Sequence, residues 1–149
     1  MKVRKKAKDK KPKMNEEWLT KAFRTVNCHF FDNEVPGTTI VKFKKDCGHR
    51  LANGEYKRAD AYYDHERETI FLDDMLAYFP DMATIALAHE MSHAHLRFKG
   101  YTGWPVDCGH GTIFQLEIGR LWKAGFYDGL LTLLLALPIL GAISQWAMC

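Results

Sequence analysis

The sequence has few cysteines, and none of them forms the paired motif of a disulfide scaffold or a cysteine-ligated metal site. The four cysteines lie far apart, and no two are spaced as C-x-x-C. Small secreted domains depend on several disulfides, whereas a chain of 149 residues is long enough to bury a core without them. We therefore expect reduced cysteines and a single folded domain. The cysteines are Cys28, Cys47, Cys108 and Cys149.

A secretory signal is also missing, because the basic run at the N-terminus leads into no apolar segment. Residues 1–13 carry eight Lys or Arg and one Asp, a net charge of +7, which leaves −4 for residues 14–149 from the total of +3. A signal peptide would continue into about 7–15 apolar residues, but MNEEWL follows here. We expect a cytoplasmic protein with a basic arm at residues 1–14.

The basic arm has two interpretations that the sequence leaves open. Its cations could neutralise DNA phosphates, without sequence preference and with a strong salt dependence, or they could stay solvated. No aromatic residue lies among them to stack on a base. The candidate DNA contacts are Lys2, Arg4, Lys5, Lys6, Lys8, Lys10, Lys11 and Lys13.

Charge is absent from the other end of the chain. Residues 129–149 are 21 residues without a charged side chain, close to the roughly 20 that span a bilayer as a helix. The alternative is a pair of buried helices broken at Pro138, and Pro138 and Gln145 both weaken the membrane interpretation. On length, we expect residues 129–149 to associate with a membrane.

Between these two ends, hydrophobic periodicity predicts an α+β domain over residues 15–128. Asn15 is a candidate helix cap, Pro80 starts a second helix, and Gly125 is a candidate stop for a third. The expected elements are a helix ending near residues 32–37, a strand at 38–45, a polar loop at 46–60, a hairpin of strands at 61–64 and 69–73, a helix from 80, a loop at 100–109 and a final helix from about 110.

The second predicted helix carries the sequence AHEMSHAHLRF, residues 88–98. At about 100° per residue, His89 and His93 share a helix face, so both imidazoles can reach one metal ion. Glu90 lies next to them and can take a proton from a reacting water. His95 faces away, and we interpret it as a surface or core-edge residue. This spacing predicts a metal site with Glu90 as a general base.

A catalytic zinc site usually has a third protein ligand, and the motif DCGH offers two candidates. It occurs at residues 46–49 and again at 107–110. The second copy lies in a loop that can fold back onto the preceding helix, and the glycines beside His110 allow a close approach of the backbone. We therefore choose His110, and interpret Cys47 and His49 as parts of a polar loop.

The sequence HEMSHA, followed after a loop by GHG and a helix with Phe114, resembles the SprT-like family of zinc metalloproteases. The similarity extends from Trp18 to about Leu131 and includes VPGTTIVKF, AYYD and TIFLDDML. The resemblance implies a zincin-like core, with a small, mostly antiparallel sheet packed on an active-site helix. It also implies a Zn²⁺ ion held by His89, His93 and His110, with Glu90 as general base. The expected activity is hydrolysis of peptide bonds in protein substrates, including DNA-associated proteins.

Other functions stay open. The core could be a non-catalytic zinc-binding protein that holds a partner on DNA, or a membrane-attached interaction module. Glu90 argues against both, because a structural zinc site does not need a carboxylate beside the metal. For an enzyme, we expect the strand at residues 61–64 to be the sheet edge that binds an extended substrate. The candidates for stabilising the oxyanion are Tyr62, Tyr63, His65, Arg97 and Tyr101.

Overall fold

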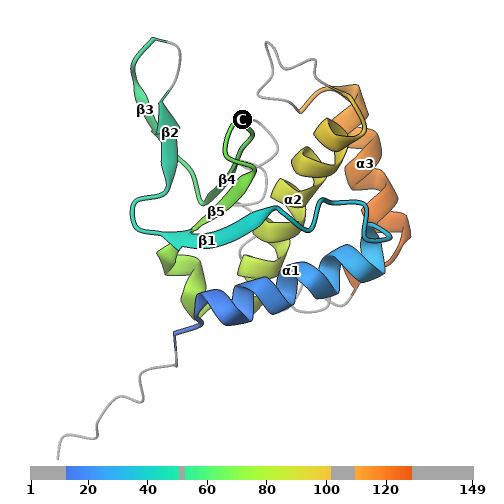
Figure 1. Cartoon of the computed structure of the whole chain (residues 1–149), viewed down its shortest axis with the longest axis horizontal. Helices are drawn as coiled ribbons and strands as arrows, with labels where there is room; N and C mark the ends of the chain where they lie inside the picture. The colour runs from blue at the N-terminus through green and yellow to red at the C-terminus, as the bar shows by residue number, and fades with distance from the viewer. Residues whose placement is uncertain (1–12, 51–52, 102–109, 129–149) are drawn as a thin grey trace, which may run out of the picture.

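The computed structural model describes residues 13–50, 53–101 and 110–128, which form an α+β fold (Figure 1). Most of the predicted elements are present with small shifts at their ends. The described elements are α1 (Glu16–Phe30), β1 (Ile40–Lys44), β2 (Gly48–Arg50), β3 (Tyr56–Arg58), β4 (Ala61–Asp64), β5 (Thr69–Asp73), the 3-10 helix η1 (Asp74–Tyr78), α2 (Pro80–Phe98) and α3 (Thr112–Lys123).

The main sheet has three strands in the order β1-β5-β4. The central strand β5 is parallel to β1 and antiparallel to β4. The expectation of a mostly antiparallel sheet is therefore wrong, because this sheet is mixed. After β1 the chain leaves the sheet for β2 and β3, and the β4–β5 hairpin then returns β5 in the direction of β1.

The predicted loop at residues 46–60 contains a second sheet, so that prediction is wrong in part. Strands β2 and β3 pair antiparallel, with Gly48 opposite Arg58. Their connection holds the turn sequence Asn53-Gly54, in which Asn53 Oδ1 accepts a hydrogen bond from the N–H of Glu55 and Gly54 has φ of +85°. A Cβ on Gly48 would lie 2.5 Å from the carbonyl oxygen of Lys57. Glycine thus permits close pairing of the two strands.

Helix α1 packs its apolar face onto the sheet and α2, as its periodicity predicts. The side chain of Asn15 accepts a hydrogen bond from the N–H of Trp18, so the predicted cap is confirmed. Leu19, Phe23 and Val26 on this helix are buried. They join a core that includes Val41, Ile70, Leu72, Leu87, Met91 and Leu121.

Helix α2 is the centre of the domain. It contacts α1, α3, β4, β5 and η1, and Figure 1 shows it between the sheet and α3. Almost every side chain from Ala86 to His95 is buried, including the polar Glu90, Ser92 and His93. The histidine motif therefore lies inside the molecule rather than on a solvated helix face.

Both chain ends lie outside the part of the molecule that the structure describes. These ends are the arm at residues 1–12 and the segment 129–149 predicted to associate with a membrane. Residues 102–109, which include Cys108, also lie outside the described part. Among the helices that are described, none has the length and apolar character needed to cross a membrane.

Candidate metal centre

Three histidine side chains, two from α2 and one from the residues just before α3, converge on one point. His89 and His93 lie one turn apart on α2, and His110 lies two residues before the start of α3. The Nε2 atom of His110 is 3.0 Å from Nε2 of His89 and 3.2 Å from Nε2 of His93. The structure thus brings together the predicted set of His89, His93 and His110, a group that can hold a metal ion.

The geometry of these nitrogen atoms fits a tetrahedral metal ion. Zinc binds imidazole nitrogen at about 2.0–2.1 Å, so two ligands on a tetrahedron have nitrogens roughly 3.3 Å apart. The observed distances of 3.0 and 3.2 Å are close to that value. A neutral imidazole nitrogen either donates or accepts one hydrogen bond, so three converging Nε2 atoms cannot all satisfy one another. A cation that receives three lone pairs removes this conflict.

The environment keeps these imidazoles neutral. Burial, together with the neighbouring His110 ring, lowers the pKa of His89 from 6.5 to about 4. Burial and the two other histidines lower the pKa of His93 to about 2. Neutral imidazoles retain the lone pair that a metal needs, so both residues can act as ligands at neutral pH.

Phe114, in the first turn of α3, fixes the three rings from one side. Its ring centroid lies 4.2 Å from that of His93, and the two planes are nearly parallel, with 20° between them. It lies 4.9 Å from the ring of His89 and 4.7 Å from the ring of His110, at steep angles to both. An aromatic residue that touches all three ligands limits the directions in which they can turn.

Glu90 follows His89 on α2 and is buried. Burial raises its pKa from 4.5 to about 8, although a hydrogen bond from the backbone N–H of Tyr63 partly offsets this rise. In the absence of a cation the carboxyl group thus holds a proton at neutral pH, while a nearby cation would favour the carboxylate. Glu90 is therefore a group that can both accept and release a proton beside the histidines.

Strand β4 lies at one edge of the main sheet, as predicted for residues 61–64. Among the residues of the described ranges, it pairs with β5 alone. Of the candidates for the oxyanion, Tyr62 accepts a hydrogen bond from Lys44 Nζ at 2.9 Å and stacks on Phe71. Tyr101 is largely exposed. The geometry selects none of the five.

In the first copy of DCGH, Cys47 has a structural role. The prediction of a polar loop is wrong for Cys47, which is fully buried. Its N–H donates to Asp73 Oδ2 at 3.1 Å, and burial raises the pKa of its thiol to about 12. His49 belongs to β2. Cys47 is thus an unreactive core residue.

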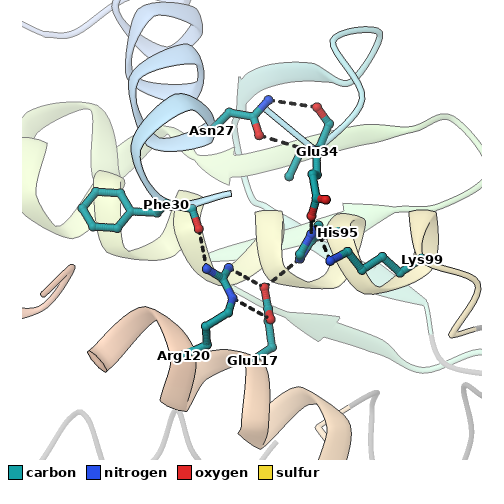
Figure 2. Close-up of polar contacts among 8 residues, drawn as sticks. Asn27, Phe30, Glu34, His95, Lys99, Glu117 and Arg120 are labelled. Carbon is teal, nitrogen blue, oxygen red and sulfur yellow. Dashed lines mark hydrogen bonds and ion pairs between the residues drawn. The ribbon is translucent and has the colours of Figure 1, made fainter. Parts of the chain in front are cut away.

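A cluster of five polar side chains, two of which are buried, was missed by sequence reasoning (Figure 2). His95 is 3% exposed, so its interpretation as a surface or core-edge residue is wrong. Its Nδ1 lies 2.7 Å from Glu117 Oε1, and its Nε2 lies 2.8 Å from Glu34 Oε2. Arg120 and Lys99 complete the cluster by pairing with Glu117 and Glu34 respectively.

The sequence did contain a signal for this cluster. Glu117 occurs with Phe114 and Leu121 at the i, i+3, i+7 spacing of a buried helix face, where a carboxylate needs partners. Burial alone would raise the pKa of Glu117, but hydrogen bonds from His95 and Arg120 lower it to about 2. Glu117 is therefore a charged group in the interface between the helices, and its carboxylate accepts hydrogen bonds from His95 and Arg120.

Of the eight basic residues proposed to contact DNA, Lys13 is the one in the described part of the chain. Its Nζ lies 3.3 Å from Asp74 Oδ2 and 5.8 Å from the ring centre of Tyr78. Lys13 is thus folded against η1. The remaining seven, which extend from Lys2 to Lys11, fall within residues 1–12.

Comparison of the chain with protein-family models, with curated proteins and with solved structures found no match.

Proposed function

We propose that this protein is a zinc-dependent metalloendopeptidase of the SprT-like type. The observation that carries the proposal is the convergence of Nε2 atoms from His89, His93 and His110 beside a buried carboxylic acid, Glu90. A purely structural zinc site is closed by four protein ligands, whereas three ligands leave a position for a reacting molecule. The three imidazoles and a neighbouring carboxyl group are the donor set of a hydrolytic zinc site.

Each residue has a distinct part in this proposal. His89, His93 and His110 hold the ion, and Phe114 keeps their rings in place. When bound, zinc supplies Lewis acidity to the attacking water and to the scissile carbonyl. Glu90 accepts the proton of that water and delivers it to the amine that leaves. Its raised pKa, the result of burial, suits a carboxyl group that must carry a proton between the two steps.

The substrate is expected to be an extended segment of a protein. Strand β4 lies at the sheet edge and is linked to the site, because the N–H of Tyr63 donates to Glu90. A peptide added along this edge would form main-chain hydrogen bonds and so be recognised largely without regard to its sequence. Unfolded proteins and flexible loops can adopt this conformation. DNA-associated proteins are our candidate substrate class, because the basic arm could bind the DNA that carries them.

The experiment that tests the proposal is cleavage of an unfolded protein, casein, by the full chain. The protein is stripped with a chelator, assayed, reloaded with one equivalent of zinc and assayed again, with and without DNA. We expect cleavage in the zinc-loaded form and none in the stripped form. A chain that binds one zinc ion tightly and cleaves nothing would instead support the non-catalytic zinc-binding protein.

A further inference from the structure

The position of His110 depends on α3. His110 is joined to this helix through Gly111, and Gln115 on its first turn donates from Nε2 to the carbonyl oxygen of His110 at 3.3 Å. The N–H of Gln115 also donates to the carbonyl oxygen of Gly111 at 3.1 Å. The two residues before α3 are thus tied to its first turn. A shift or rotation of α3 on α2 would move His110 relative to the other two histidines.

Helix α3 meets α2 at two successive points. At the first, Phe114 stacks on His93 in the metal site. At the second, Glu117 Oε1 lies 2.7 Å from His95 Nδ1, one helical turn further along α3 and two residues further along α2. Both contacts join the same two helices, so a shift of α3 at the second point would also move Phe114 at the first. Stacked rings tolerate sliding, whereas a charge-assisted hydrogen bond fixes both distance and direction.

Glu117 is itself held on its other side by Arg120. The guanidinium donates to both oxygens of Glu117, at 3.0 Å from Nε and 2.7 Å from Nη2. Its Nη1 donates to the carbonyl oxygen of Phe30, near the C-terminus of α1, at 2.6 Å. Figure 2 shows the resulting chain of contacts from α1 through α3 to α2. A cation at the end of α1 also complements the helix dipole.

His95 is fixed from both edges of its ring. Its Nδ1 faces Glu117, and its Nε2 faces Glu34 in the segment after α1. Lys99 Nζ holds the same Glu34 oxygen at 2.8 Å. Because both nitrogens face carboxylate oxygens, the imidazole has little freedom to turn and gives Glu117 a fixed partner. The cluster therefore connects α1, α2 and α3 through polar bonds that meet at the buried pair His95 and Glu117.

We propose that Glu117 is a positioning residue of the metal centre: its bonds to His95 and Arg120 set the placement of α3, and through it that of His110 against His89 and His93. This inference rests on the metal site of the proposed function and adds a residue outside the proposed ligand set. A merely stabilising Glu117 would affect unfolding alone. A positioning Glu117 also governs the affinity and the coordination geometry of the bound metal.

The test compares the full-length Glu117→Gln variant with the wild-type protein. The two quantities measured are the zinc affinity and the visible absorption spectrum of the cobalt(II) form. Glutamine keeps the size of the side chain but loses its charge and one acceptor oxygen. Val41→Ala, a buried change on β1, is the control for lost stability, because it lies on the strand remote from α3. We expect the zinc Kd of Glu117→Gln to rise by at least about tenfold, as for other residues that support ligands indirectly. We also expect its cobalt spectrum to change, while Val41→Ala keeps the wild-type values.

The outcomes separate this inference from the proposed function. A Glu117→Gln protein with the zinc affinity and cobalt spectrum of the wild type overturns the positioning role, whatever happens to its unfolding temperature. If Glu117→Gln does not fold, Arg120→Gln replaces it, since Arg120 is partly exposed and its loss removes one of the two partners of Glu117 and the donor to the carbonyl oxygen of Phe30. Unchanged metal binding in that variant overturns the inference equally. If the wild-type chain binds no zinc, the metal site itself is contradicted, and with it the proposed function.

Discussion

The rings of Phe114 and His93 are stacked, with their centroids 4.2 Å apart and their planes 20° from parallel. The same Phe114 ring meets His89 and His110 at steep angles, so one apolar side chain touches all three histidines. Metal ligands are usually oriented by polar partners of the ring. Here an aromatic residue on α3 adds a packing constraint to the orientation of every ligand.

Phe114→Leu should weaken zinc binding while the protein remains folded. Leucine fills part of the space but cannot stack, so the imidazole rings can rotate more freely in the metal-free protein. Binding the metal must then restrict this rotation, which costs conformational entropy. We expect the Kd for zinc to rise by roughly tenfold, as for other residues that orient ligands indirectly. Competition with a chromogenic chelator measures it. Phe126→Leu is the matched control, since Phe126 is buried against Phe30. Equal affinities for the two variants would argue against this role of Phe114.

Replacing each proposed ligand by alanine should abolish tight zinc binding. This applies to His89, His93 and His110, because two imidazoles alone form an incomplete site. Alanine at His49 or His29, on β2 and α1, should leave one equivalent bound. Metal analysis after gel filtration distinguishes the five proteins. Retention of zinc by His110→Ala together with its loss from His49→Ala would show that the first copy of DCGH supplies the ligand.

The raised pKa of Glu90 should affect how the stability of the metal-free protein depends on pH. Burial raises the pKa of Glu90 to about 8 in the folded state from an ordinary 4.5. Between these values the folded chain holds a proton that the unfolded chain releases, so the contribution of Glu90 to stability falls as pH rises. Glutamine does not titrate. Glu90→Gln should therefore gain thermal stability relative to the wild type, by more at pH 8 than at pH 5.

Thermal unfolding in excess chelator at the two pH values measures this difference. The other ionisable groups are the same in both proteins, so their effect largely cancels in the comparison. A stability difference that is the same at both pH values, or larger at pH 5, would contradict a buried Glu90 with a raised pKa.

The local part of the site could be predicted from the sequence, because helix geometry fixes it. His89 and His93 share a face on any helix, and Glu90 lies beside them. The choice of His110 over His49 depended on a loop that follows α2 directly. The polar cluster could not be derived in this way, because Glu34, His95 and Glu117 lie far apart in the sequence. Their proximity is a consequence of how α1, α2 and α3 pack.

The errors in the fold have a similar origin. The strands β2 and β3 are three residues each and polar, so they lack the alternation that identifies longer strands. The sequence Asn53-Gly54 was the available signal for a hairpin there. The parallel pairing of β1 with β5 depends on the path of the chain between them, and no local pattern encodes that path. His95 was misplaced because α2 is covered on nearly all sides.

If the arm contacts DNA, its removal should change the salt dependence of binding. Deletion of residues 1–12 removes seven of the eight cations and keeps Lys13, whose bond to Asp74 belongs to the folded domain. Each lost phosphate contact should reduce the slope of log K against log salt by about 0.9 on duplex DNA. Titrations at several salt concentrations measure the slopes. Identical slopes for the full and shortened chains would show that the arm stays solvated and does not contact DNA.

The measurement that tests the central claim most directly is peptide hydrolysis by Glu90→Gln loaded with zinc. Glutamine preserves the size and position of the side chain but cannot accept the proton. We predict that this variant binds one equivalent of zinc as the wild type does, while the rate of hydrolysis of a protein that the wild type cleaves falls by about 10²–10⁴-fold. Undiminished hydrolysis by zinc-loaded Glu90→Gln would contradict the assignment of Glu90 as the general base, and with it the account of this site.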